Sequence, residues 1–363
     1  MKKRFAIILT AALLLCTFMP LCLACSGTKS TPATLIPGIG FQWDTVEPDA
    51  NRNASNSSGM QNPQCFSRLS SVIDSASHAA AAIRRIFSCR KADGGMFTFT
   101  VYGKGHGVGM SQLGSIEYAR QGWSYDQILL HYYPGVSMEK EHPIPLMIYN
   151  GAGRETEDFL VRAVQQEMGA DAASPEAYKA QAVAIYTMLK QKKFKLTSGD
   201  VACSTVKNSE LSDTVRSAVK SVLGQYMACE GEAVNAAFFA SSAGKTTDSQ
   251  SVWGESLPYL KGGVESPETV RVSASTVTAK ELKSMVRRYN ATHPGKTITL
   301  SGDPSQWLEI LTHDGARGDV GYVSGIRVGN MTMSGNAFRT VYNQYRPRGT
   351  AALQSHCFSV QYS

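Results

Sequence analysis

Apolar residues in this 363-residue chain follow helical spacing in some stretches and alternate in others. Between residues 156 and 168 they fall at 159, 160, 163, 164 and 168, which is typical of a helix with one buried face. In MFTFTVY at 96–102, bulky residues alternate with threonine, which predicts a strand. Read in this way, the chain has helices over 111–122, 124–133, 156–168, 174–193, 212–224, 278–289 and 334–342. The expected strands are 96–102, 233–240, 307–314, 322–328 and 356–362.

Several of these helices carry end signals. Ser174 and Pro175 suit an N-cap and a first helical residue, and Thr278 with Glu281 forms a capping box. Gly224 is suited to end the helix before it. Helices and strands do not alternate in a regular βαβ rhythm, so we predict an α+β fold with largely antiparallel strands in one domain over 96–363.

The first 95 residues differ from this domain. Residues 1–24 have three basic residues, an apolar run and a small-residue end, which predicts a signal peptide and an exported protein. Cleavage after Ala24 leaves Cys25, in the context CLAC, as a candidate lipid anchor, and plain secretion is the alternative. Residues 25–95 form a tether rich in Ser, Asn, Pro and Gly, with one candidate helix over 66–88.

Charge and cysteine content exclude some classes of protein. Without the signal, 33 basic residues face 29 acidic ones, too even a balance for a nucleic-acid binder but suited to an anionic cell wall. Cysteine and histidine spacing of the zinc type is absent from the sequence, so we expect neither metal nor cofactor. Disulfides Cys65–Cys89 and Cys203–Cys229 suit an exported protein, whereas buried reduced cysteines are the other interpretation.

The stretch GKGHGVGMSQLG at 103–114 follows the first expected strand. It lacks the G-x-G-x-x-G register and the GK[ST] ending, so its spacing argues against a nucleotide site. Its glycines allow the backbone to approach a ligand closely, and Gln112 falls near the start of a helix. A tight turn that merely satisfies His106 is the alternative interpretation.

Two further stretches carry candidate chemistry. Glu167 falls at the C-terminal end of a helix, where the helix dipole and partial burial raise a carboxyl pKa and favour a general acid. An ordinary surface glutamate is the alternative. Ser241 and Ser242 end a strand and enter a glycine turn without a GxSxG elbow, so contacts to a sugar fit better than a serine hydrolase.

Three motifs together resemble the stage II sporulation protein D and amidase-enhancer (SpoIID/LytB) family of cell-wall proteins. They are GKGHGVGMSQLGSIEYARQGWSYDQILLHYYPGV, VRAVQQEMGADAASPEAYKAQAVA and FFASSAGKTTDSQSVWGESLPYL, within a similarity over 97–363. The resemblance implies a peptidoglycan lytic transglycosylase whose catalytic acid is Glu167. It implies that substrate contacts come from His106, Gln112, Gln181, Ser241 and Ser242, and less strongly from Lys179 and Tyr186.

The family resemblance also leaves a second function open. A non-catalytic member would bind glycan strands and modulate a cell-wall amidase as its partner. Where relatives commonly read AQAVAARTYA, this chain reads AQAVAIYTML, so Tyr186 replaces an arginine and Met188 a tyrosine. The segment between Glu167 and Lys179 is also one residue longer than usual.

The order of the motifs departs from the family as well. In relatives the glycine motif comes last, after a strand like HCFSVQY, whereas here it begins the domain. A circular permutation explains this order, with KEHPIP at 140–145 joining the former ends. It predicts that strand 97–102 pairs antiparallel with strand 357–362.

Overall fold

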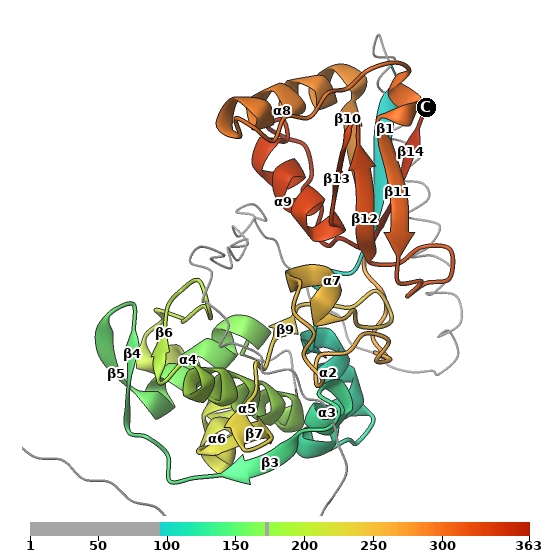
Figure 1. Cartoon of the computed structure of the whole chain (residues 1–363). Helices are drawn as coiled ribbons and strands as arrows, with labels where there is room; N and C mark the ends of the chain where they lie inside the picture. Colours follow the sequence, from blue (N-terminus) through green and yellow to red (C-terminus); the bar gives the residue numbers. More distant parts are fainter. Residues whose placement is uncertain (1–94, 171–173) are drawn as a thin grey trace, which may run out of the picture. The chain divides into compact units, whose positions relative to one another are not determined.

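The computed structural model describes residues 95–170 and 174–363 (Figure 1). The predicted signal, Cys25, the tether with its helix over 66–88 and the pair Cys65–Cys89 lie outside them. Part of the lengthened segment after Glu167 does so too. Within the described ranges, no helix has both the length and the apolar composition of a membrane span.

The predicted helices are present, with small differences at their ends, and a short helix α7 adds to them. The bounds are α2 (Gln112–Arg120), α3 (Tyr125–Tyr132), α4 (Thr156–Met168), α5 (Pro175–Gln191), α6 (Asp213–Val222), α7 (Ser249–Trp253), α8 (Ala279–Thr292) and α9 (Gly335–Tyr345). Two short 3-10 turns span Asn208–Glu210 and Pro304–Gln306. The capping box of Thr278 and Glu281 is formed as predicted. Ser174 and Pro175 begin α5 as predicted, although the Ser174 hydroxyl makes no capping hydrogen bond.

The strands form several small sheets, and seven of their nine pairings are antiparallel. Three-stranded sheets have the orders β10-β1-β14, β11-β12-β13, β3-β7-β8 and β5-β4-β6, and β2 pairs with β9. The bounds are β1 (Met96–Tyr102), β2 (Met110–Ser111), β3 (Ser137–Lys140), β4 (Leu146–Tyr149), β5 (Ala152–Glu155), β6 (Lys195–Leu196), β7 (Gln225–Cys229), β8 (Glu232–Ala233), β9 (Phe238–Phe239), β10 (Val272–Thr278), β11 (Leu308–His313), β12 (Val323–Val328), β13 (Met331–Met333) and β14 (Phe358–Tyr362). The predicted α+β class, with mainly antiparallel strands, is confirmed.

Helix α5 is the centre of one hydrophobic core. It packs against α2, α3, α4, α6 and β7. Eleven of its 17 residues are buried, among them Ala177, Ala180, Ala182 and Ala184. A helix buried on most of its sides needs small side chains, because they let neighbouring helices approach closely. This core holds α4 and its C-terminal Glu167 beside α2.

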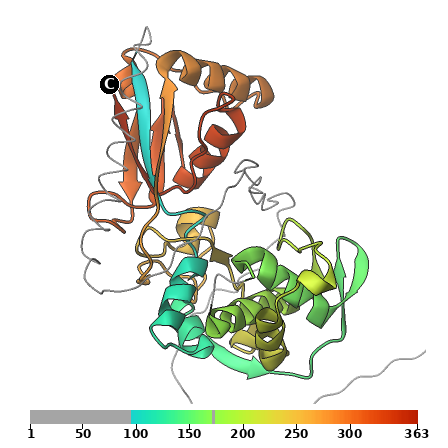
Figure 2. The same cartoon turned by 180° about the vertical axis from the view of Figure 1, so that it is seen from behind.

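Strand β1 is the middle strand of a second core. Phe97, Phe99 and Val101 alternate with partly exposed threonines and are buried, as the alternating pattern predicted. Phe99 contacts Phe338 and Tyr342 of α9, and α8 and α9 lie on one side of the strands (Figures 1 and 2). The register of β1 with β14 runs antiparallel from Phe97–Tyr362 to Val101–Phe358, so the predicted pairing of these two strands is confirmed.

Two predictions are wrong. The expected strand over 233–240 is interrupted, and only its ends at β8 and β9 pair. Between them the Ala237 carbonyl accepts hydrogen bonds from Met110 N and the Tyr133 hydroxyl instead of a regular strand partner. Cys203 and Cys229 are free thiols, so the disulfide interpretation is wrong for this pair and the alternative of reduced cysteines holds. Cys203 lies near charged residues of β5 and α4, whereas Cys229 lies in β7 near Tyr259, so each thiol has different surroundings.

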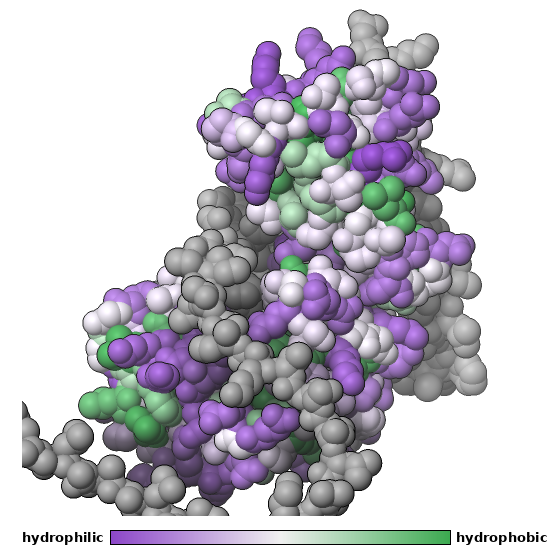
Figure 3. Space-filling model, in the orientation of Figure 1, coloured by the Kyte–Doolittle hydropathy of each residue, from purple (hydrophilic) through white to green (hydrophobic). Residues whose placement is uncertain are grey.

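Exposed apolar residues gather at β4 on an otherwise largely polar face. Figure 3 shows one face that is largely hydrophilic, with a hydrophobic patch at the lower left, where β4 and β5 are drawn in Figure 1. Leu146 and Ile148 of β4 are 62% and 39% exposed, and Ile144 just before them is 38% exposed. Leu146 and Ile148 lie two positions apart in β4 and therefore point to the same side of the strand, which accounts for a small patch.

Candidate active site

The glycine motif takes a path that only glycine allows at some positions. After β1, Gly103, Gly105, Gly107 and Gly109 all have positive φ. A Cβ atom on Gly109 would lie 2.0 Å from the carbonyl oxygen of Ala237, well inside contact distance. The backbone of the motif therefore packs directly against the backbone of residues 236–243, which a side chain would prevent.

Backbone hydrogen bonds fix these two segments together. Lys104 N donates to Ser241 O at 2.8 Å, and Ser241 N donates to Lys104 O at 3.0 Å. Further along, β2 pairs in parallel with β9. The glycine motif and the segment around Phe238 thus form one surface, from which α2 starts, although their paired residues Met110 and Phe238 are 128 residues apart in the sequence.

Helix α2 begins at the end of this surface. Ser111 is its N-cap and accepts a hydrogen bond from Gly114 N at 3.2 Å. Gln112, the first helical residue, is 7% exposed, and its Nε2 donates to Glu167 Oε2 at 3.2 Å. This hydrogen bond joins the glycine motif to the predicted acid.

Glu167 is partly exposed in the last turn of α4. Besides Gln112, it accepts a weaker hydrogen bond from Ala202 N at 3.4 Å. Desolvation by burial raises the pKa of Glu167, whereas these two donors lower it because they favour the charged form. The net direction is upward, as its position predicted, with burial as the main cause.

The segment that brings Ala202 to Glu167 is held by α4 itself. Arg162, earlier on that helix, donates to Val206 O at 2.6 Å and pairs with Asp158 at 2.8 Å. Tyr149 lies nearby and donates to Val201 O at 3.1 Å, and Glu167 is among the charges that raise the pKa of Tyr149, after desolvation. Nothing in the local sequence pattern indicated these neighbours.

His106 lies beside this surface as a neutral ring. Its Nδ1 accepts a hydrogen bond from Val108 N at 3.2 Å, and its ring lies near Phe239 and Trp253. Desolvation, with a smaller effect of the Arg339 charge, lowers the pKa of His106 to about 4. A histidine with this pKa is uncharged at neutral pH, so it suits neutral hydrogen bonding better than proton donation.

Ser241 and Ser242 are buried at the same surface. Ser242 N donates to Glu268 Oε1 at 2.7 Å, and the Ser242 hydroxyl accepts from Gly244 N at 3.0 Å. The Ser241 hydroxyl has no hydrogen-bond partner among the described residues. Both residues lie beside the glycine motif. They are at most 1% exposed, so solvent does not reach their side chains in this structure.

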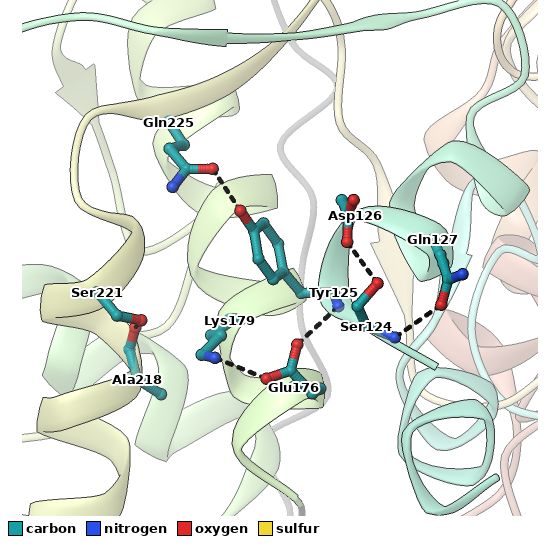
Figure 4. A network of polar contacts seen from close by, with 9 residues as sticks. All are labelled: Ser124, Tyr125, Asp126, Gln127, Glu176, Lys179, Ala218, Ser221 and Gln225. Carbon is teal, nitrogen blue, oxygen red and sulfur yellow. Dashed lines mark hydrogen bonds and ion pairs between the residues drawn. The ribbon is translucent and has the colours of Figure 1, made fainter. Parts of the chain in front are cut away.

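The other predicted substrate contacts lie elsewhere on α5. Gln181 is fully buried, and its amide has no hydrogen-bond partner among the described residues. Lys179 pairs with Glu176 at 2.6 Å, and Glu176 also accepts from Tyr125 N at 2.9 Å (Figure 4). This network joins the starts of α3 and α5.

Tyr186, at the position of the expected arginine, is 1% exposed. Its hydroxyl donates to Glu141 Oε1 at 2.9 Å, and Glu141 also pairs with Lys190 at 2.5 Å. Tyr186 thus contacts the connection 140–145. The structure brings Gln112 to Glu167, and His106, Ser241 and Ser242 to the adjoining surface, whereas Lys179 and Tyr186 belong to other networks.

The main hollow of the described residues lies away from Glu167 and Gln112, and the described residues offer no metal site. Among residues 95–170 and 174–363, no cluster of three or more His, Cys, Asp or Glu side chains could hold a metal ion. A hollow of about 560 Å³ lies over β11 and β12 and is lined by residues including Trp307, Glu309 and Arg327. Gln112, Glu167, His106 and the two serines do not line this hollow.

Two curated proteins are similar to parts of this chain, and both are named Stage II sporulation protein D. The protein from Bacillus amyloliquefaciens is 50% identical over 50 residues, 14% of this chain and 14% of the relative. The protein from Bacillus subtilis (strain 168) is 26% identical over 164 residues, 37% of this chain and 46% of the relative. The chain thus spans less than half the length of either relative. No protein-family model matches the chain.

The steric role of Gly109 is testable by substitution. We expect Gly109→Ala to lower the free energy of unfolding by about 2–4 kcal/mol, since a positive φ and a clash with Ala237 act together. Gly122→Ala is the control, because Gly122 also has positive φ but nothing lies within 4 Å of its would-be Cβ. It should cost only about 1 kcal/mol. Equal losses in urea denaturation would contradict close backbone packing at Gly109.

The hydrogen bond from Gln112 is testable through the pKa of Glu167. We expect Gln112→Leu to raise that pKa further, because it removes a donor that favours the carboxylate. A carbon-13 NMR titration of the Glu167 carboxyl group measures the change. Gln166→Leu, at the exposed neighbouring position, is the control and should leave the titration unchanged. A Gln112→Leu titration that matches wild type would mean that this contact does not act on Glu167.

Proposed function

We propose that this chain is a peptidoglycan lytic transglycosylase with Glu167 as its single acid and base. The observation that carries the proposal is the partly exposed Glu167 carboxyl with a raised pKa, held by Gln112 of the glycine motif. The names of the two partial relatives support a role in sporulation and hence in the cell wall. The resemblance of the three motifs to the SpoIID/LytB family supports the specific reaction.

The reaction needs one group that first gives and then takes a proton. Protonated Glu167 donates to the oxygen that leaves C1 of N-acetylmuramic acid, and the C1–O bond breaks through an oxocarbenium-like state. The C6 hydroxyl oxygen of the same sugar then bonds to C1 and releases its proton to the Glu167 carboxylate. The product is a 1,6-anhydro end, and no water is consumed. A second carboxylate for activating water is therefore unnecessary.

The other residues have roles that follow from their placement. Gln112 orients the carboxyl and limits how far burial raises its pKa. We propose that neutral His106, together with the surface that carries Ser241 and Ser242, holds the glycan strand. Three of the expected contacts are buried or paired, namely Gln181, Lys179 and Tyr186. They would contact glycan only after these side chains or the glycan strand change position.

We further propose that the protein acts outside the cytoplasm on glycan strands. The signal-like residues 1–24 support export, and Cys25 is the candidate for a lipid anchor. The second candidate function is a non-catalytic glycan-binding protein that modulates a cell-wall amidase. Tyr186 favours it, since this side chain replaces an expected basic contact and is engaged with Glu141.

The catalytic role of Glu167 is tested with Glu167→Gln. On peptide-stripped glycan strands we expect the release of anhydro ends, measured by mass spectrometry, to fall at least about 100-fold. The wild-type rate should fall as pH rises through the pKa of Glu167, because the proton-donating form is lost. Glu157→Gln, at the other end of α4, is the matched control and should retain activity.

The possible results separate the two functions. Undiminished anhydro products from Glu167→Gln would refute the catalytic assignment. Binding of glycan by wild type without any cleavage would support the amidase-modulating alternative instead.

We also propose that the domain is a circular permutation of the family arrangement. The pairing of β1 with β14 supports this, and Met96 and Ser363 exchange two backbone hydrogen bonds at 2.8 and 3.0 Å. The start of β1 and the end of β14 are thus close enough to be joined by a hairpin turn. The connection 140–145, between β3 and β4, is where the former ends would be joined.

A reordered chain tests the permutation. The reordered chain begins at Pro143 and runs to Ser363. An Asn-Gly turn then joins Ser363 to residues 96–142, which form the new C-terminal part. Glu141 thus stays attached to β3. We expect it to fold cooperatively, with a melting temperature within about 8 °C of the unmodified domain, since about 1 kcal/mol shifts it by a few degrees. Cutting instead inside α5, after Ala182, is the control and should abolish folding. Failure of the reordered chain to fold would argue against the permutation.

A further inference from the structure

Glu268 is a second carboxyl group at this surface; unlike Glu167 it is buried, and it lies outside every motif that the sequence singled out. It lies in the long connection between α7 and β10 and is 8% exposed. A buried carboxylate is costly unless hydrogen bonds compensate for its lost hydration. Its contacts therefore indicate what it is for.

One oxygen of Glu268 joins two of the segments that build the candidate site. Oε1 accepts from the Ser111 hydroxyl at 2.6 Å and from Ser242 N at 2.7 Å. Ser111 is the N-cap of α2 and Ser242 belongs to the segment after β9. Glu268 thus clamps the start of α2 to residues 241–243.

The second oxygen lies in a tightly packed place. A Cβ on Gly114 would be 2.8 Å from Glu268 Oε2, 2.2 Å from Ser266 Oγ and 2.0 Å from the Tyr132 hydroxyl. Tyr132 and Ser266 share a hydrogen bond of 2.5 Å, which ties the Glu268 connection to α3. The carboxylate also lies near the positive end of the α2 dipole, which stabilises negative charge.

The clamp acts on the predicted acid through one residue. Ser111 immediately precedes Gln112, whose amide donates to Glu167. No hydrogen bond joins Glu268 to Glu167, and the charge of Glu268 is not a cause of the raised pKa of Glu167. Its influence on the acid therefore passes through the position of the α2 start.

We propose that Glu268 is a positioning residue that holds Ser111 and Ser242 so that Gln112 stays in contact with Glu167. For its effect on turnover, this inference rests on the proposed function. Its structural part, the link from Glu268 to the Gln112–Glu167 contact, does not.

A pair of variants isolates the acceptor from the charge. Glu268→Gln and Glu268→Leu are both neutral and similar in size, but only the glutamine keeps an oxygen for Ser111 and Ser242. The titratable groups near Glu167, namely Tyr149 and its neighbours Cys203, Arg154 and Asp200, are the same in both. A difference between the variants therefore reports the clamp.

Two measurements are made on each variant, prepared as the full 363-residue chain. In carbon-13 NMR titrations we expect the pKa of Glu167 to be higher in Glu268→Leu than in Glu268→Gln, because the Gln112 donor is lost. On peptide-stripped glycan we expect kcat to be about 10- to 100-fold lower in Glu268→Leu, with KM changed much less, since misplacement acts on the chemical step.

Each outcome decides the inference. Equal Glu167 titrations and equal kcat in the two variants would overturn it, even if both melt at lower temperature, because only a structural role would remain. If wild type cleaves no glycan, the proposed function fails, and the titrations alone decide whether Glu268 positions Gln112. If Glu268→Leu does not fold, Ser111→Ala compared with Ser111→Thr tests the same link, since threonine keeps the hydroxyl.

Discussion

Backbone packed directly on backbone, between residues 103–111 and 236–243, sets the geometry on which the candidate site depends. The exchange of hydrogen bonds between Lys104 and Ser241 fixes one end, and the β2–β9 pairing fixes the other. Positive φ angles at Gly103, Gly105, Gly107 and Gly109 let the chain follow this path. Because α2 starts where the contact ends, the position of Gln112, and through it the setting of Glu167, follows from this one interface.

Burial near this interface shifts the pKa values of Glu167 and His106 in opposite directions. Burial raises the pKa of Glu167 because its charged form is the anion, and burial lowers the pKa of His106 because its charged form is the cation. In both cases burial favours the neutral form of the side chain. A neutral carboxyl can still donate a proton, whereas Nδ1 of the neutral His106 ring is already occupied as the acceptor of a hydrogen bond from Val108 N. The assignment of the acid to Glu167 is consistent with this difference.

Local signals predicted the helices well, because capping residues and helical spacing act within one turn or two. The capping box at Thr278 and the start of α5 are examples. Strand β10, with the sequence VSASTVT, has small and hydroxyl side chains and gave no such signal, since its conformation depends on pairing with β1. The strand expected over 233–240 is wrong because distant residues interrupt it. The Ala237 carbonyl accepts hydrogen bonds from Met110 N and the Tyr133 hydroxyl instead of from a strand partner.

At the site, resemblance and position indicated Glu167 and Gln112, but neither could indicate Glu268. Its role depends on Ser111, 157 residues earlier in the chain, and on a backbone amide. Tyr186 illustrates the same limit, since its contact with Glu141 depends on where the connection 140–145 runs. Such contacts arise only when the fold brings distant segments together.

The central place of β1 in its sheet has a consequence for the order in which the chain can fold. Its neighbours β10 and β14 both come much later in the sequence, and Tyr102 meets Ser355 across 253 residues. During synthesis, β1 therefore emerges long before either strand that covers its two edges. Closing so long a loop is entropically unfavourable, and unpaired edges are prone to aggregation until it closes. The helical core around α5 is built largely from segments between these strands, so it can be complete while the sheet still lacks its last strand.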